Sequence, residues 1–240
     1  MRDPRDRLIV ALDVENPAQA EALLDQLQGV VSTFKVGAQL FTAAGPAAVE
    51  LVQKRGGKVF LDLKYHDIPH AVAGAVREAT RLGVAMLTLH ASGGLAMLEV
   101  AVGAAKTASK EWKVAKPLCL AVTVLTSLDR AALQRELNIP LSVEGQVLHL
   151  AQLARVAGAD GSVASPQEIR TLRMALGREW VIVTPGVRPA GSEAQDQARV
   201  ATPEAALKAG ADCLVIGRPI TGAPDPAKAA LAVLEEMARA

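Results

Sequence analysis

Four ionisable residues stand close together in the stretch VFLDLKYHDIP, residues 59–69: Asp62, Lys64, His66 and Asp67. Carboxylates beside a lysine favour the charged form of its side chain, so Lys64 is expected to remain an ammonium. An ammonium suits general acid chemistry, in which it gives a proton to a reacting atom. It does not suit Schiff-base chemistry, which needs the neutral amine as a nucleophile.

The apolar run that precedes these residues predicts a strand that carries them. Because side chains at i and i+2 of a strand point to one face, Asp62 and Lys64 are expected to share a face, opposite to Leu61 and Leu63. Lys35, in the preceding apolar run, is expected to join them from the neighbouring strand. The alternative is a buried ion-pair network that only fills the end of the fold, since such networks also perturb ionisable groups.

Two further segments predict a phosphate site. VIVTPGVRP (181–189) and CLVIGRPIT (213–221) each end an apolar run with glycine and then arginine. Gly217 would let backbone N–H groups approach an anion, and Arg188 and Arg218 are planar, permanently charged donors. A turn with a solvated arginine explains either segment alone, whereas the pair at adjacent strands favours a phosphate monoester.

The segment between them, RPAGSEAQDQARVAT (188–202), is long and polar for a connection from a strand to a helix. This composition favours a lid that closes over a bound ligand and excludes water. Gln197 within it could reach the phosphate. An exposed surface loop is the alternative interpretation.

Eight short apolar runs alternate with segments of helical period, which predicts a parallel sheet covered by helices. The predicted fold is therefore α/β, a single (β/α)8 TIM barrel over residues 1–240. A doubly wound sheet is the alternative, but its first strand is often followed by a glycine fingerprint, and here DVEN (13–16) follows. A capping residue before proline predicts helix starts at Asn16, Ser165 and Thr202. The apolar runs are LIVALD (8–13), FKVG (34–37), KVFLDLK (58–64), VAMLTLHA (84–91), PLCLAVTVLT (117–126), GSVAS (161–165), VIVTPG (181–186) and CLVIG (213–217).

In such a barrel the functional side chains lie where the strands end. The unexpected polar residues of this chain fall in or just after seven of the eight runs, and a ring of polar residues from separate strands predicts an active site. These residues are Asp13, Lys35, Asp62, Lys64, His90, Thr126, Ser127, Arg188 and Arg218.

The overall composition excludes several function classes. The net charge is +1 and aromatic residues make up 2% of the chain, so neither a basic surface nor a stacking surface for nucleic acid is expected. No apolar run is long enough to span a membrane, and the polar start MRDPRDR lacks the apolar region of a secretory signal, so we expect a cytoplasmic protein. The histidines are scattered and the two cysteines lie in separate apolar runs, so neither a metal site nor a disulfide framework is predicted.

Several motifs of the chain resemble those of the type 1 orotidine 5'-phosphate decarboxylase family. They are IVALDV, FKVGAQLF, VFLDLKYHDIP, AVTVLTS, VTPGVRP and LVIGRPIT, and they extend nearly from end to end. The motif DLKxHDIP is highly specific for this family. The resemblance implies a (β/α)8 barrel that works as a homodimer without metal or organic cofactor. It also implies removal of the carboxylate from C6 of orotidine 5'-phosphate, which gives UMP and CO2.

The resemblance implies a role for each matching residue. Lys35, Asp62 and Lys64 would form the charged array, with Lys64 as the proton donor to C6. Asp67 and Ile68 would enter the site of the partner subunit. The other implied contacts are Asp13 and Lys35 with the ribose, Thr126 and Ser127 with the pyrimidine, and Arg188, Gln197, Gly217 and Arg218 with the phosphate.

One departure from the family is His70-Ala71, where Asn-Thr is common. The missing hydroxyl at Ala71 puts the partner subunit's usual ribose contact in doubt.

Two other functions stay open at this point. One is a Mg²⁺-dependent sugar-phosphate synthase or decarboxylase of the same barrel superfamily, which shares the DxKxxD core. The other is a catalytically silent nucleotide-binding barrel. A sequence that lacked Lys64 or Asp67 would indicate such a barrel, and this chain has both residues.

Overall fold

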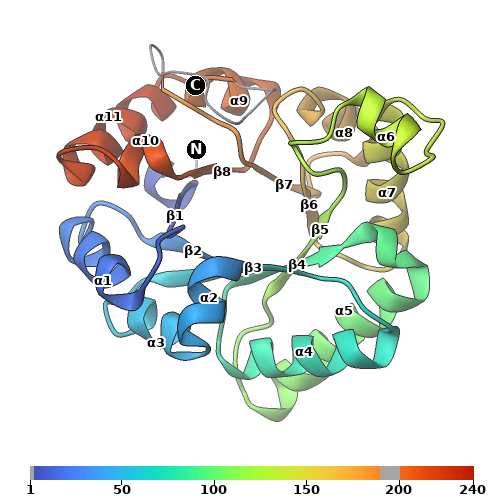
Figure 1. Ribbon diagram of the computed structural model, residues 1–240, viewed down its shortest axis with the longest axis horizontal. Coiled ribbons are helices and arrows are strands. Elements are labelled where there is room, and N and C mark those ends of the chain that lie inside the picture. The colour runs from blue at the N-terminus through green and yellow to red at the C-terminus, as the bar shows by residue number, and fades with distance from the viewer. Residues whose placement is uncertain (1–2, 190–200) are drawn as a thin grey trace.

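Parallel strands close into a barrel in the computed structural model, which describes residues 3–189 and 201–240. Each strand pairs with the next along the chain, and the last strand returns to pair with the first (Figure 1). This closure confirms the predicted TIM barrel and excludes the doubly wound sheet, which would have two open edges. The strands are β1 (Leu8–Ala11), β2 (Thr33–Gly37), β3 (Lys58–Tyr65), β4 (Met86–His90), β5 (Leu118–Val122), β6 (Gly161–Val163), β7 (Val181–Thr184) and β8 (Cys213–Ile216).

Helices form the outer ring around the strands (Figure 1). None of the helices within residues 3–189 and 201–240 is both long and apolar enough to cross a membrane. The helices are α1 (Pro17–Gln26), α2 (Ala38–Ala44), α3 (Ala47–Gln53), α4 (Pro69–Arg81), α5 (Gly94–Glu111), α6 (Arg130–Arg135), α7 (Val143–Val156), α8 (Ile169–Leu176), α9 (Pro203–Ala209), α10 (Arg218–Thr221) and α11 (Pro226–Met237), with short 3₁₀ turns η1 (Pro4–Asp6) and η2 (Ala91–Gly93).

Two of the three predicted helix starts are confirmed. The side chain of Asn16 accepts a hydrogen bond from the Gln19 amide, and that of Thr202 caps α9 in the same way. The prediction at Ser165 is wrong, because α8 begins at Ile169. The Ser165 hydroxyl donates instead to the buried carboxylate of Glu168, so the chain makes a turn before the helix begins.

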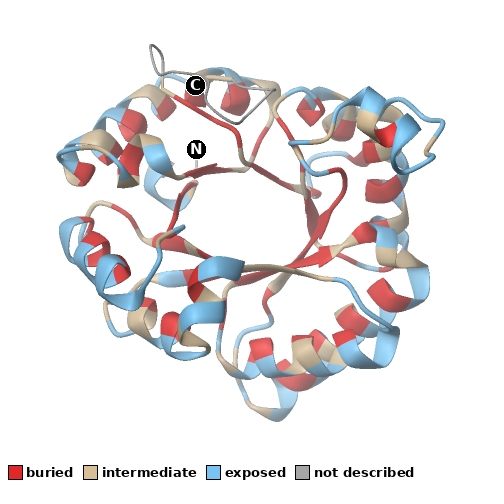
Figure 2. Ribbon diagram, in the orientation of Figure 1, coloured by how far each residue is buried: buried red, intermediate tan, exposed pale blue. Residues whose placement is uncertain are grey.

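The apolar core has two layers, and strand alternation separates them. The larger layer lies between the strands and the helices (Figure 2). The smaller layer fills the inside of the barrel and consists of Ile9, Ala11, Phe60, Met86, Leu120, Val183 and Val215. Further along β3 and just beyond β1, the inward positions carry charged side chains such as Asp62 and Asp13. At that level the barrel opens into a pocket.

Candidate active site

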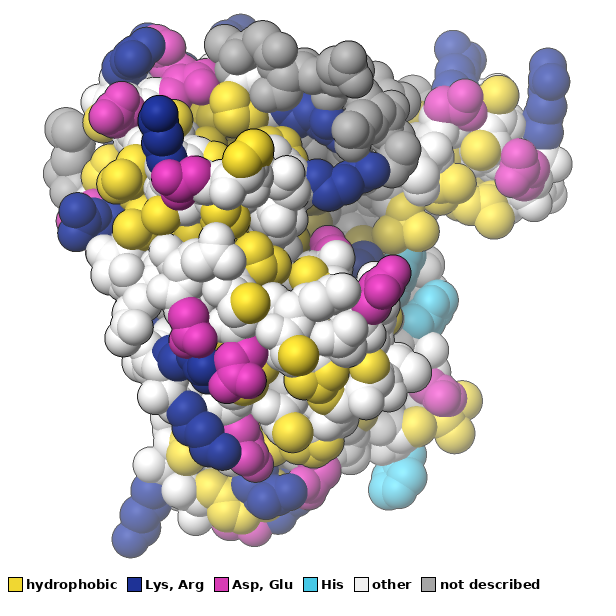
Figure 3. All heavy atoms as spheres, turned by 60° about the vertical axis from the view of Figure 1, so that its left-hand side comes forward, with side chains coloured by type: hydrophobic (Ala, Val, Ile, Leu, Met, Phe, Trp, Pro, Cys, Tyr) yellow, Lys and Arg dark blue, Asp and Glu magenta, His cyan; other side chains and the backbone are white. Residues whose placement is uncertain are grey.

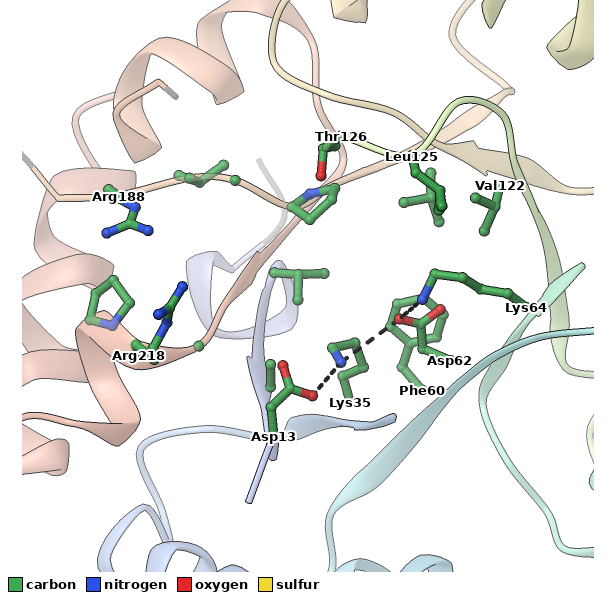
Figure 4. Close-up of a pocket in the computed structure, with 18 of the residues that line it drawn as sticks. Asp13, Lys35, Phe60, Asp62, Lys64, Val122, Leu125, Thr126, Arg188 and Arg218 are labelled. Carbon is green, nitrogen blue, oxygen red and sulfur yellow. Dashed lines mark hydrogen bonds and ion pairs between the residues drawn. The ribbon is translucent and has the colours of Figure 1, made fainter. Parts of the chain in front are cut away.

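A pocket of about 420 Å³ lies at the carboxyl ends of the strands, above the inner apolar layer (Figure 4). This volume is in the range of small-molecule sites. The pocket residues come from both ends of the chain, because β8 closes against β1. They are Ala11, Asp13, Lys35, Phe60, Asp62, Lys64, Val122, Val124, Leu125, Thr126, Val163, Pro185, Gly186, Val187, Arg188, Val215, Gly217, Arg218, Pro219 and Thr221.

Charged side chains just after β1 and on β2 and β3 form a row of alternating sign: Asp13, Lys35, Asp62 and Lys64 (Figure 4). Lys35 Nζ lies 2.7 Å from Asp13 Oδ1 and 3.7 Å from Asp62 Oδ2. Lys64 Nζ lies 2.9 Å from the same Asp62 oxygen. The side chains of Lys35 and Asp62 are only 12% and 13% exposed, so each depends on its charged neighbours for compensation.

The end of β3 is irregular where it carries this array. Pairing with β4 is regular up to Leu61 and resumes at Tyr65 after a shift in register. Lys64 has a φ of 50°, in the left-handed region that a lysine seldom adopts. The buried hydroxyl of Thr88 on β4 accepts from the Lys64 amide at 2.8 Å and donates to Asp62 Oδ1 at 3.0 Å. The shared face of Asp62 and Lys64 is therefore the result of a bulge and not of regular alternation.

Two histidines stack beside the array. The rings of His66 and His90 lie 5.1 Å apart between centroids and 16° from parallel. His90 Nδ1 is 2.6 Å from the Ser92 hydroxyl. Burial lowers the pKa of His90, and the charges of His66 and Lys64 lower it further. We interpret both histidines as supports beside the array.

Two arginines lie across the pocket from the charged array. Arg188 follows β7 and Arg218 follows β8, and their guanidinium groups point into the pocket (Figure 4). Arg188 is buried, and its backbone amide donates to the Ala201 carbonyl at 3.0 Å. Gly217 lines the wall between Arg218 and the barrel. Two permanent cations at one end of a pocket provide a site for a dianion such as a phosphate monoester.

The structure does not bring every predicted residue into this pocket. Thr126 lines it, whereas Ser127 does not. Asp67 and Ile68 also lie outside it, and Ile68 is 68% exposed. Gln197 and most of the predicted lid fall within 190–200, outside the described residues.

Sequence reasoning missed two features of the site. One is the apolar wall opposite the row of charges, which includes Val122, Leu125 and Val163. Its residues stand in strand-like runs, where nothing distinguishes a pocket wall from core. The other is Thr88, which stands two residues before His90 on the inward face of β4. The sequence signal that could have identified Thr88 is a polar residue at an inward position of an apolar strand.

The described residues contain no group of three or more His, Cys, Asp or Glu side chains arranged to hold a metal ion. On the face in Figure 3, basic and acidic side chains are interspersed and do not gather by sign.

Comparison with known proteins gives one family. The model of the "Orotidine 5'-phosphate decarboxylase / HUMPS family" matches residues 6–233. The chain is 58% identical to the orotidine 5'-phosphate decarboxylase of Moorella thermoacetica over 97% of this chain and 92% of that protein. It is 52% identical to that of Geobacter sulfurreducens over 97% and 96% of the two chains. The crystal structure of orotidine 5'-phosphate decarboxylase from Lactobacillus acidophilus superposes with a TM-score of 0.86, at 38% identity, over 96% of this chain and 98% of that one.

Proposed function

Because the chain belongs to the orotidine 5'-phosphate decarboxylase / HUMPS family, we propose that it converts orotidine 5'-phosphate into UMP and CO2. One observation carries this proposal. A single pocket holds a row of alternating charges at one side and two arginines at the other, with room for a nucleotide between them. The arginines suit the 5'-phosphate, and the row of charges suits a reaction that develops charge at the base.

The reaction breaks the bond between C6 and the carboxylate carbon, and the bonding electron pair stays on C6. This pair lies in the plane of the ring, where the π system cannot delocalise it, so the protein has to stabilise it electrostatically. Lys64 is the group we assign to that task and to the later transfer of a proton to C6. Its ammonium is held by Asp62 at 2.9 Å before any substrate arrives, so little reorganisation is needed during the reaction.

Asp62 also lies on the side from which the carboxylate leaves in this assignment. Two unit charges about 4 Å apart repel by about 4 kcal/mol at an effective dielectric constant near 20. Lys35 and Lys64 both contact Asp62 and offset part of that repulsion. We therefore assign the larger effect to stabilisation of the carbanion and the smaller one to repulsion of the substrate carboxylate.

The phosphate supplies binding energy at a distance from the reacting carbon. Arg188, Arg218 and Gly217 are assigned to it, and Gln197 is proposed to join them from the lid. Asp13 and Lys35 are assigned to the ribose hydroxyls and Thr126 to the pyrimidine. The contact of Ser127 with the pyrimidine remains a prediction from the sequence, because Ser127 does not line the pocket. Interactions with the non-reacting phosphate can hold the carboxylate against the array, which raises the rate as well as the affinity.

A second subunit is part of the proposal. Asp67 and Ile68 are absent from the pocket of their own chain, and the Ile68 side chain is largely exposed. An exposed isoleucine next to a carboxylate, just beyond the strand that carries the array, is well placed to enter the pocket of a second copy. We assign both residues to the partner's site in a homodimer, with Asp67 as a further carboxylate near Lys64. A cytoplasmic location and a single domain over 1–240 remain predictions from the sequence.

A Mg²⁺-dependent sugar-phosphate enzyme is not favoured. Asp62 contacts two ammonium groups, which neutralise the carboxylate that a divalent cation would need as a ligand. The relatives that match most of this chain are also named as orotidine 5'-phosphate decarboxylases.

The proposal is tested by following the ultraviolet absorbance of orotidine 5'-phosphate with the purified chain, with and without EDTA. We expect turnover that is the same in both conditions. Loss of turnover in EDTA would favour the magnesium-dependent alternative. Binding of UMP without turnover would favour a catalytically silent nucleotide-binding barrel.

A further inference from the structure

We propose that Thr88 is a positioning residue for the charged array, and this inference rests on the proposed decarboxylase function. Its side chain makes two hydrogen bonds within the array. Thr88 Oγ1 donates to Asp62 Oδ1 at 3.0 Å and accepts from the Lys64 backbone amide at 2.8 Å. One hydroxyl therefore holds both the carboxylate and the backbone of the assigned proton donor.

The register of the barrel explains why a side chain is needed here. Leu61 pairs with Leu87, and Tyr65 pairs with Leu89. The segment 62–64 of β3 therefore faces only Thr88 on β4. The regular hydrogen-bond ladder between two strands cannot satisfy the backbone groups of such a bulge. The Lys64 amide therefore donates to the Thr88 hydroxyl instead of to a backbone carbonyl.

The same hydroxyl determines which Asp62 oxygen meets the lysines. Oδ1 is occupied by Thr88, whereas Oδ2 lies 2.9 Å from Lys64 Nζ and 3.7 Å from Lys35 Nζ. If Thr88 did not hold Oδ1, the carboxylate could rotate about its Cβ–Cγ bond and change both lysine distances. Thr88 is fully buried and does not line the pocket, so it acts on the substrate only through these two residues.

Thr88 also stabilises a backbone conformation that is unfavourable for lysine. The φ of Lys64 is 50°, and a non-glycine residue in this region persists only where its surroundings hold it. A change at Thr88 therefore moves Lys64 Nζ by two routes, through the backbone and through Asp62. A small displacement of a reacting group is enough to reduce turnover strongly.

The test compares Thr88→Val with Thr88→Ser. Valine keeps the shape of threonine and removes both hydrogen bonds, whereas serine keeps the hydroxyl. For Thr88→Val we expect kcat for orotidine 5'-phosphate to fall by about 10-fold to 100-fold, because a buried donor and acceptor lose their partner. KM and the affinity for UMP should change by less than about threefold, since the phosphate arginines are untouched. Thr88→Ser should keep kcat within about threefold of the unchanged chain.

Thr184→Val is the matched control. Thr184 is a fully buried threonine on β7 whose hydroxyl has no hydrogen-bond partner among the described residues. We expect this variant to keep kcat and KM. Should Thr88→Val not fold, Thr88→Cys against Thr88→Ser tests the same point, because the two side chains are similar in size and the thiol is the weaker hydrogen-bonding group.

Several results would overturn the inference. Thr88→Val with unchanged kcat would show that the hydroxyl is dispensable, and equal losses in the serine variant and in the valine or cysteine variant would show that packing matters instead. A loss confined to KM would also contradict a role in positioning Lys64. Failure of the proposed function itself is distinguishable, because the unchanged chain would then bind UMP or another phosphate without decarboxylating orotidine 5'-phosphate.

Discussion

Lys64→Ala is the most direct perturbation of the proposed chemistry. If C6 approaches Lys64 Nζ to about 3 Å, close to the present 2.9 Å between Nζ and Asp62 Oδ2, a full unit charge on C6 would be stabilised by about 5.5 kcal/mol at an effective dielectric constant near 20. Each 1.4 kcal/mol, roughly, is a factor of ten in rate, so this stabilisation corresponds to about 10⁴-fold. Loss of the proton donor lowers the rate further. We expect kcat to fall by at least about 10⁴-fold.

The variant is expected to fold, because Asp62 keeps a charged partner. Lys35 Nζ remains 3.7 Å from Asp62 Oδ2, and Thr88 remains on Oδ1. The arginines at the other side of the pocket are unchanged, so UMP should still bind, with an affinity that calorimetry can measure. The assay is single-turnover conversion of orotidine 5'-phosphate at high enzyme concentration, which can detect rates far below normal.

A matched control is available at the opposite end of the barrel. Lys116 Nζ lies 2.6 Å from Asp160 Oδ2, and the same oxygen accepts from the Cys119 amide. Lys116→Ala therefore also removes a lysine from a carboxylate that keeps another partner. We expect this control to leave kcat unchanged. A loss of less than about tenfold in folded Lys64→Ala would refute the assignment of Lys64 as proton donor and main electrostatic group.

Arg188→Ala and Arg218→Ala should each lower kcat/KM by about 10-fold to 100-fold, the cost of a charged hydrogen bond to phosphate, and a normal value in steady-state kinetics would remove that arginine from the phosphate site. Mixing inactive Lys64→Ala and Asp67→Ala subunits should restore about a quarter of the active sites after random exchange, and no recovery despite exchange shown by mass spectrometry would count against a shared site. Burial raises the pKa of Cys119 to about 12, so at pH 8 almost all of this thiol is protonated and iodoacetamide should leave it unmodified in the folded protein; rapid alkylation would contradict that burial.

Much of the site could be predicted because strand alternation carries over from the core to the pocket. Ile9 and Ala11 lie in the inner layer, and Asp13, the next residue of the same parity, reaches the pocket. Phe60 and Asp62 repeat the relation on β3. The parity of a polar residue at the end of an apolar run therefore predicts whether its side chain reaches the pocket, provided that the strand stays regular.

The remaining features depend on contacts between strands, which one strand's sequence does not contain. The bulge that sets the φ of Lys64 depends on the register between β3 and β4. The predicted helix start at Ser165 failed for a similar reason, because its hydroxyl bonds the Glu168 side chain and does not cap α8. The apolar wall with Val122 and Leu125 has the same composition as the core.

The closure of the barrel has a consequence for how the enzyme matures. The charged array lies in the first 65 residues, just after β1 and on β2 and β3, whereas Arg188 and Arg218 follow β7 and β8. The two sets meet only when β8 pairs with β1, through contacts such as that between Leu8 and Leu214, about 200 residues apart. Contacts between such distant residues carry a large loop-closure entropy and form slowly. A chain still emerging from the ribosome therefore carries Lys64 long before Arg188 and Arg218 can join it in one pocket, and the proposed activity has to wait until the last strand has been synthesised and paired.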